Sequence, residues 1–199
     1  MKPAVKPKGR AEYRAALAAL LGRLQEKLRA APARALPVRM YIAGGAALYL
    51  LTGARVSEDV DATFSRRVLL GEDLEVSYQD ADGRPRVLYL DRNYNDTLGL
   101  LHERAYEDAR PVEMAGVDPD VLEVRMLTPV DLAVTKLARF ADQDREDIEL
   151  LAREGLLDPA AVRTRAEEAL AGYVGDARPV RTSVDVACRV IEDAARRRK

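Results

Sequence analysis

The chain has little of the side-chain chemistry that disulfide-linked folds and many metal sites require. Its 199 residues include one cysteine, Cys188, and one histidine, His102. A lone cysteine excludes an internal disulfide and a cysteine-based zinc site, and it fits a reducing compartment. A lone histidine excludes a histidine-rich metal site, and its apolar neighbours Leu100 and Leu101 favour a structural role. We expect Cys188 to be a small core side chain.

Long hydrophobic runs are also missing. The longest apolar runs, such as AALYLL at residues 46–51, are far shorter than the ~20 residues that cross a bilayer. The first ten residues, MKPAVKPKGR, lack the apolar core of a signal peptide. With 48% hydrophobic and 33% charged residues, the composition is that of a soluble globular protein. We therefore expect a cytoplasmic protein with no membrane partner.

Charge of one sign does not dominate the chain. The formal net charge is −1, which gives no overall electrostatic attraction to nucleic acid. Basic residues nevertheless gather in residues 1–10 and in residues 196–199. We expect residues 1–10 to form a disordered, solvated tail. The alternative is that these tails contact RNA or a protein partner, with binding that weakens steeply as salt is raised.

The most informative stretch begins with an apolar run from Val38 to Ala43 that ends at Gly44 and Gly45. The β-branched and aromatic residues of this run predict a strand, and the AALYLL that follows predicts a helix. The glycines let the backbone turn sharply and approach a ligand, and a helix start presents unpaired N–H groups to an anion. This strand, turn and helix are suited to seat phosphate groups.

Two aspartates follow at the spacing of one strand face. Across Glu58 to Phe64, alternation places Asp59, Asp61 and Thr63 on the face opposite the apolar residues. Neighbouring like charges are costly unless a cation, an arginine or a proton compensates them, and Mg²⁺ favours carboxylate oxygens. The pair therefore predicts a divalent-metal site, and the alternative is the solvent face of an amphipathic strand.

These residues resemble a known signature. Gly44-Gly45, thirteen intervening residues and Asp59-Val60-Asp61 resemble the nucleotidyltransferase superfamily typified by DNA polymerase beta, and Arg55-x-Ser57 resembles the version in AbiEii-type toxins. Those families usually have Gly-Ser in place of Gly44-Gly45, so one side-chain contact to phosphate is missing here. The resemblance implies Mg²⁺ or Mn²⁺ at the two aspartates and a nucleoside triphosphate as substrate. It implies nucleotide binding by Gly44, Gly45, Arg55, Ser57 and Lys136.

A predicted hairpin follows the aspartate pair. Strand-like runs at Leu74 to Tyr78 and Pro85 to Asp91 flank Asp80-Ala81-Asp82-Gly83, which is a turn sequence. Alternation places Asp91 at the end of the second strand, on the face of Val87 and Tyr89. Superfamily members commonly carry a third carboxylate beside the pair, so the resemblance implies that Asp91 helps to activate the acceptor hydroxyl. The alternative is that Asp91 only begins a turn.

A helix start marks the second informative stretch. Thr128 as N-cap, Pro129 at the first helical position and Asp131 at the third predict that a helix begins here. Lys136 lies at the edge of the predicted apolar stripe of this helix. A lysine in that position is suited to reach a triphosphate and to neutralise developing charge.

Lys136, Asp144 and Asp147 resemble the C-terminal motif of AbiEii-type and related nucleotidyltransferases. In a straight helix Lys136 and Asp147 would lie about 16 Å apart and could not grip one group. We therefore predict a break near Asp142 or Gln143, with Asp144 as the N-cap of a second helix. Capping alone is an alternative explanation for both acids. The resemblance makes them motif or supporting residues of the site.

The rest of the chain is predicted from periodicity and turn signals. We expect helices at Ala11–Ala30, from Asp158 onward and at Ser183–Arg197, and short strands at Arg110–Met114 and Val121–Leu127.

Together these patterns predict an α+β protein, a nucleotidyltransferase-like mixed β-sheet flanked by helices with a small C-terminal helical part. Residues 11–155 would form the nucleotidyltransferase-like domain with its N-terminal helix, and residues 156–199 a helical extension. The predicted function is Mg-dependent transfer of a nucleotide from a nucleoside triphosphate to an acceptor. The predicted catalytic residues are Asp59, Asp61, Asp91 and Lys136.

No motif in the sequence identifies the acceptor of the transferred nucleotide. The AbiEii-type resemblance implies RNA, tRNA in particular, as one acceptor, and a cognate antitoxin as a protein partner. The alternatives are a non-catalytic regulatory or partner-binding protein that keeps the fold, and a metal-dependent hydrolase built on the same acids.

Overall fold

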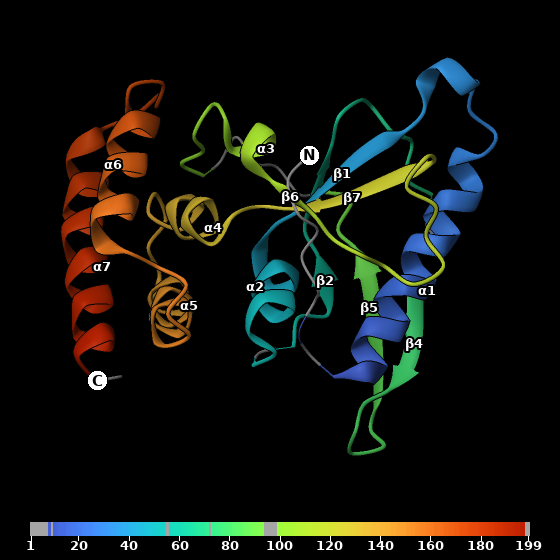
Figure 1. Ribbon diagram of the computed structural model, residues 1–199, viewed down its shortest axis with the longest axis horizontal. Helices are drawn as coiled ribbons and strands as arrows, with labels where there is room; N and C mark the ends of the chain where they lie inside the picture. The colour runs from blue at the N-terminus through green and yellow to red at the C-terminus, as the bar shows by residue number, and fades with distance from the viewer. Residues whose placement is uncertain (1–7, 9, 55, 72, 94–98, 198–199) are drawn as a thin grey trace. The chain divides into compact units, whose positions relative to one another are not determined.

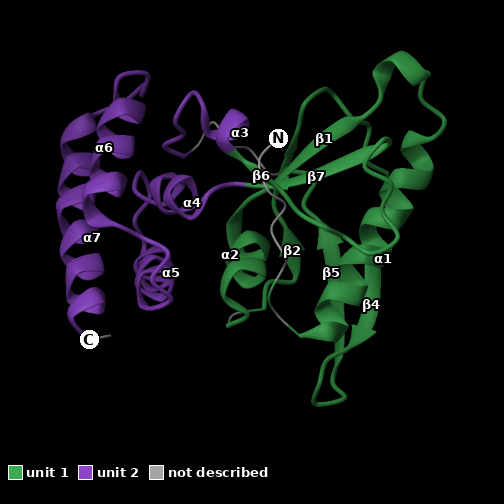
Figure 2. Cartoon of the chain, viewed as in Figure 1, with its two compact units in different colours: residues 1–94, 109–126 green, residues 95–108, 127–199 purple. Residues whose placement is uncertain are grey.

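The chain is divided into two units in the computed structural model (Figures 1 and 2). The structure describes residues 8, 10–54, 56–71, 73–93 and 99–197. Residues 1–94 and 109–126 form the first unit, and residues 95–108 and 127–199 form the second. The predicted nucleotide-binding residue Arg55 and most of the predicted basic tail lie outside the described residues. The described sheets all belong to the first unit, and the predicted α+β class is confirmed.

A four-stranded sheet of the first unit has the strand order β3-β1-β7-β6. Strand β1 (Val38–Ile42) pairs in parallel with β7 (Leu122–Met126) and antiparallel with β3 (Ala62–Phe64). Strand β6 (Arg110–Pro111) pairs antiparallel with the other edge of β7. Four of the five β1 residues are buried, as the nearly unbroken apolar run predicts.

A three-stranded sheet has the order β2-β5-β4. Strand β5 (Pro85–Leu90) pairs antiparallel with β4 (Glu75–Gln79) and in parallel with β2 (Asp59–Val60). The predicted hairpin is confirmed, and Asp80 Oδ1 closes its turn by accepting the N–H groups of Asp82 and Arg84 at 3.0 and 2.9 Å.

The prediction of one continuous strand from Glu58 to Phe64 is wrong in one respect. The strand is interrupted at Asp61, so that β2 and β3 belong to different sheets. At this point the chain stops pairing with β5 and starts pairing with β1, and Asp61 O accepts the Ala43 N–H at 2.9 Å. Asp61 therefore lies where the two sheets meet.

Two helices complete the first unit. Helix α1 (Ala11–Leu28) packs on β4 and β5 and buries the leucines that recur at helical spacing. Helix α2 (Gly44–Thr52) packs on β2 and ends at Gly53, which has φ 74° and donates its N–H to Tyr49 O at 2.7 Å. A left-handed glycine is a common helix end because it has no Cβ to clash.

The second unit is helical in its described part. It contains α3 (Ala105–Asp108), α4 (Pro129–Thr135), α5 (Asp142–Arg153), α6 (Pro159–Leu170) and α7 (Ala177–Arg197). Helices α5 and α6 both pack on α7, and α4 packs on α6. Cys188 is buried in α7, as predicted. Among the described helices, none is both long enough and apolar enough to span a bilayer.

Helix α7 begins six residues before the predicted start at Ser183. Asp176 Oδ1 accepts the Arg178 N–H at 3.0 Å, and Pro179 lies in the first turn, where a missing N–H costs no hydrogen bond. Buried Val180 lies four residues before buried Val184, so the apolar periodicity of this helix extends upstream of the predicted start.

Arg165 on α6 joins three segments of the second unit. Its guanidinium donates to Asp131 Oδ1 at 2.7 Å and to Asp108 Oδ2 at 2.9 Å. Asp131 also accepts the hydroxyl of Thr128 at 2.7 Å, and its N–H donates to Thr128 Oγ1 at 3.1 Å. The predicted N-cap of α4 is confirmed, and charge-assisted bonds tie it to α6 and to the end of α3.

Tyr13 of α1 has a buried hydroxyl with no hydrogen-bond partner in the described part of the chain. The side chain is 2% exposed, and its ring meets those of Tyr49 and Tyr78 edge-on at centroid distances of 4.4 and 6.3 Å. Burial raises the pKa of Tyr13, and the neighbouring tyrosines and Asp59 raise it further. The ring contributes packing, while its buried hydroxyl gains no hydrogen bond from the residues that the structure describes.

We expect Tyr13→Phe to increase the free energy of unfolding by about 1 kcal/mol, because it removes an unsatisfied buried hydroxyl and keeps the ring. Urea unfolding followed by circular dichroism measures the change. The matched control is Tyr49→Phe, which removes the hydroxyl that accepts the Arg10 N–H at 2.8 Å and should lower stability. A Tyr13→Phe variant less stable than the parent protein would contradict this account.

Candidate active site

The turn at the start of α2 places Gly44 against Asp61. Gly44 has φ +55°, and a Cβ on it would lie 1.8 Å from Oδ2 and 2.7 Å from Cγ of Asp61. A position that combines a positive φ with such a close approach admits only glycine. The Gly-Gly turn and the Asp-x-Asp segment, which the sequence separates by thirteen residues, are therefore immediate neighbours.

Three predicted carboxylates lie on one sheet face. Asp59 is opposite Tyr89 and Val60 is opposite Leu90 in the parallel pairing of β2 with β5. The Asp91 N–H donates to Val60 O at 3.1 Å, which extends the register so that Asp91 follows beside Asp61. Side chains alternate along a strand, so Asp59, Asp61 and Asp91 share the face opposite buried Val60 and Leu90.

Tyr89 lies among these carboxylates, although no sequence motif singles it out. Its side chain is 42% exposed on the face of Asp91. Partial desolvation raises the pKa of the Tyr89 hydroxyl, and the negative charges of Asp59, Asp91, Glu58 and Asp61 raise it further. Alternation along β5 already places Tyr89 on this face, so the signal was present in the sequence.

Asp91 begins the turn that is one of its two predicted roles. Its Oδ1 accepts the Asn93 N–H at 2.8 Å. Its Oδ2 makes no hydrogen bond with the residues that the structure describes. One oxygen therefore holds the turn, and the role of Asp91 as a third carboxylate of the site stays a prediction.

Ser57, predicted to bind nucleotide, is directed at Asp59. The serine is 7% exposed, and its hydroxyl donates to Asp59 Oδ1. Asp59 Oδ2 has no hydrogen-bond partner within the described ranges. The serine hydroxyl therefore contacts the carboxylate in this structure.

The carboxylate face has the composition of a partial magnesium site. Among the described residues, no group of three or more His, Cys, Asp and Glu side chains is placed to hold a metal ion. Mg²⁺ is usually bound by one or two carboxylates together with substrate phosphates and water. Asp59 and Asp61, two neighbouring carboxylates beside a glycine turn, fit an ion whose remaining ligands come from a triphosphate.

Lys136 forms a buried charge network within the second unit. Its Nζ donates to Asp147 Oδ2 at 2.7 Å and lies 3.6 Å from Asp144 Oδ1. Arg139 donates to both oxygens of Asp144 at 2.9 and 2.8 Å. All three members of the predicted motif are buried, at 8%, 0% and 2% exposure for Lys136, Asp144 and Asp147. The ammonium thus faces two carboxylates, and its contact with a triphosphate stays a prediction.

The predicted helix break is confirmed, but the capping assignment is wrong. Helix α4 ends at Thr135, Phe140 takes φ 47°, and α5 begins at Asp142. Ala141 is the N-cap, and Asp144 accepts the Ala141 N–H at 3.0 Å from the third helical position. An acid at that position can reach back to the N-cap N–H, so it caps without being the N-cap residue.

Asp144 stays ionised despite its burial. Burial by itself would raise the pKa of Asp144, but hydrogen bonds from Arg139 and the Ala141 N–H and the charge of Lys136 bring it below its usual range. Asp144 therefore faces both Lys136 and Arg139, and Lys136 also contacts Asp147.

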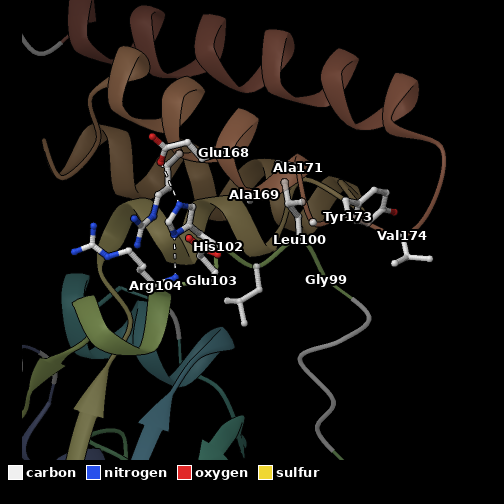
Figure 3. A pocket seen from close by; sticks show the side chains of 13 residues that line it. Gly99, Leu100, His102, Glu103, Arg104, Glu168, Ala169, Ala171, Tyr173 and Val174 are labelled. Carbon is white, nitrogen blue, oxygen red and sulfur yellow. Dashed lines mark hydrogen bonds and ion pairs between the residues drawn. The ribbon is translucent and has the colours of Figure 1, made fainter.

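His102 lines a cavity of about 980 Å³ that is formed by second-unit residues (Figure 3). Its Nδ1 accepts the Arg104 N–H at 3.1 Å, and its Nε2 lies 3.1 Å from Glu168 Oε2. An Nδ1 acceptor leaves the ring proton on Nε2, which then donates to the carboxylate. The Nδ1 contact lies within the 99–104 segment, and the Nε2 contact connects this segment to α6. Both contacts agree with a structural role for His102.

We expect Gly44→Ala to lower the free energy of unfolding by about 2–4 kcal/mol, because the new methyl group collides with Asp61 and the backbone conformation is strained. Gly22→Ala is the matched control, since a Cβ there meets nothing within 4 Å and an alanine stabilises a helix interior by about 0.5–1 kcal/mol. Urea unfolding of both variants measures the difference. Equal stabilities would show that Asp61 does not occupy this position.

We expect Lys136→Met to lower the free energy of unfolding by about 3–5 kcal/mol, because it removes a cation from a buried charge network. The double variant Lys136→Met/Asp147→Leu should recover part of this loss, since it removes the facing charge as well. Urea unfolding of the two single variants and the double variant gives the coupling. Additive effects would mean that the 2.7 Å ion pair does not exist in solution.

Comparison with known protein families matches residues 19–196 to the family described as "Nucleotidyltransferase of unknown function (DUF6036)". Neither the curated proteins nor the solved structures gave a match. The matched range contains the glycine turn, the three carboxylates of the sheet face and the Lys136 network. The chain therefore belongs to this nucleotidyltransferase family, as its resemblance to the superfamily predicts.

Proposed function

We propose that the chain transfers a nucleotide from a nucleoside triphosphate to an acceptor hydroxyl at the face formed by Asp59, Asp61 and Asp91. The observation that carries the proposal is the contact of Gly44 with Asp61, where a Cβ would lie 1.8 Å from Oδ2. Because of this contact, a backbone turn that phosphates can approach lies next to a carboxylate of the kind that suits Mg²⁺. Family membership supports the same class of reaction.

The glycine turn would receive the phosphates. Gly44 and Gly45 have no side chains to obstruct them, and α2 begins at Gly44 with the side chain of its N-cap, Ala43, unable to cap it. Asp59 and Asp61 would hold Mg²⁺ through their carboxylate oxygens. When bound, the ion supplies positive charge that offsets the charge on the triphosphate and on the departing pyrophosphate.

Asp91 would act on the acceptor. Its Oδ2, which makes no hydrogen bond with the described residues, accepts the proton as the acceptor oxygen bonds to the α-phosphorus. The bond from that phosphorus to the bridging oxygen breaks, and pyrophosphate leaves with the electron pair. The proton then passes to solvent, and no covalent intermediate with the protein is needed.

Transfer of label from α-³²P nucleoside triphosphates tests the proposal, with each of the four nucleotides, Mg²⁺ or Mn²⁺, and tRNA or the protein itself as acceptor. We expect Asp59→Asn to lower the transfer rate by at least about 100-fold, because the lost charge cannot hold the ion. Asp120→Asn, the same change at an exposed residue of the first unit, should leave the rate unchanged. Both variants should melt near the temperature of the parent protein.

Undiminished transfer by Asp59→Asn would exclude the proposed site. A thermal-shift titration with each triphosphate and Mg²⁺ distinguishes the non-catalytic alternative. An absent shift with every nucleotide, together with absent transfer, would favour a regulatory or partner-binding protein. Triphosphate breakdown without transfer would favour a hydrolase.

A further inference from the structure

Ser57 makes a hydrogen bond to Asp59, one of the two proposed metal ligands. Its hydroxyl donates to Oδ1 of Asp59 and leaves Oδ2 without a hydrogen bond in the described part of the chain. With 7% of the residue exposed, the serine is shielded from solvent. The two oxygens of the Asp59 carboxylate are therefore inequivalent, since Oδ1 accepts a hydroxyl and Oδ2 has no such partner among the described residues.

The backbone on both sides holds this hydroxyl in place. At the end of α2, Gly53 donates to Tyr49 O at 2.7 Å, and Thr52 Oγ1 accepts the Ala54 N–H at 3.2 Å. Beyond the serine, Glu58 O accepts the Tyr89 N–H at 2.9 Å as β2 joins β5. Ser57 thus lies between a helix end that closes at residues 52–54 and a strand pairing that begins at Glu58.

An occupied Oδ1 limits how Asp59 can bind a cation. Ca²⁺ takes six to eight oxygen ligands and often engages both oxygens of one carboxylate, whereas Mg²⁺ requires near-octahedral geometry at shorter distances. Each oxygen of an ionised carboxylate has about two lone-pair sites, so the Ser57 hydroxyl does not block Oδ1 but competes with a cation for it, which disfavours binding through both oxygens. Groups that hydrogen-bond to a metal ligand commonly change metal affinity 10–100-fold.

We infer that Ser57 is a positioning residue that keeps Asp59 a one-oxygen ligand and so favours Mg²⁺ over Ca²⁺ at this site. The inference rests on the proposed function, because it takes Asp59 as a metal ligand. It assigns Ser57 to the carboxylate in place of the phosphate contact that the family resemblance implies. A serine that acted only on the nucleotide would change affinity for both ions equally.

The test measures the unfolding temperature of the full chain with a saturating α,β-methylene nucleoside triphosphate while Mg²⁺ or Ca²⁺ is titrated. The half-saturating concentrations of the two ions give a selectivity ratio, in which general effects on stability and nucleotide affinity cancel. We expect Ser57→Ala to shift this ratio towards Ca²⁺ by about tenfold. Ser57→Thr, which keeps the hydroxyl, and Ser77→Ala, at an exposed position of β4, should retain the parent ratio.

The outcomes separate this inference from the proposed function. If Asp59→Asn loses the metal response and Ser57→Ala keeps the parent ratio, the role of Ser57 is excluded and the metal site stands. A metal response in Asp59→Asn equal to that of the parent protein would exclude the site itself. A shifted ratio in Ser57→Ala together with a parent ratio in Ser57→Thr supports the inference.

Discussion

The approach of Asp61 to the backbone of Gly44 is the constraint on which the first unit depends. The carboxylate occupies the space that any other residue would fill with its Cβ. The same aspartate lies where β2 ends and β3 begins, so it belongs to the junction of two sheets and to the turn before α2. A single glycine thereby couples the sheet junction to the helix start, and the candidate chemistry is located at that junction.

Buried and partly exposed aspartates of this chain are stabilised in different ways. Asp144 and Asp147 are buried, and the charges of Lys136 and Arg139 balance theirs. Asp59 is partly exposed and accepts the neutral hydroxyl of Ser57 on Oδ1, while its Oδ2 makes no hydrogen bond with the described residues. A buried carboxylate needs a compensating cation, whereas a carboxylate that keeps contact with water can be ionised beside a neutral donor.

Local patterns predicted most of the elements around this candidate site, because those elements follow from short-range rules. The apolar run before Gly44, the alternation around Asp59 and the turn signal at Asp91 each depend on a few consecutive residues. The break at Asp61 depends instead on which strand the chain pairs with, and alternation says nothing about partners. Burial nevertheless alternates across the junction, because Val60 and Ala62 are buried while Asp59, Asp61 and Thr63 are partly exposed.

Side-chain partners were the least predictable part. Sequence places Ser57 near the aspartates but does not give the rotamer that turns its hydroxyl to Asp59. It places Lys136 at the edge of a core, while its actual pairing with Asp147 depends on a turn in which Phe140 takes φ 47°. The start of α7 was missed although its apolar stripe extends upstream to Val180, and Asp176 and Pro179 mark its first turn.

The division into units has a consequence for synthesis of the chain. Residues 95–108 belong to the second unit although residues 109–126 return to the first. Strand β7, which lies between β1 and β6, is the last strand to leave the ribosome, so the four-stranded sheet cannot close until Met126 has emerged. The hydrogen bond from Arg165 to Asp108 forms later still, because Arg165 lies on α6, which follows β7 in the chain. No single cut therefore yields two intact halves, and a shortened chain ending at residue 126 would carry His102 and Asp108 without their α6 partners Glu168 and Arg165.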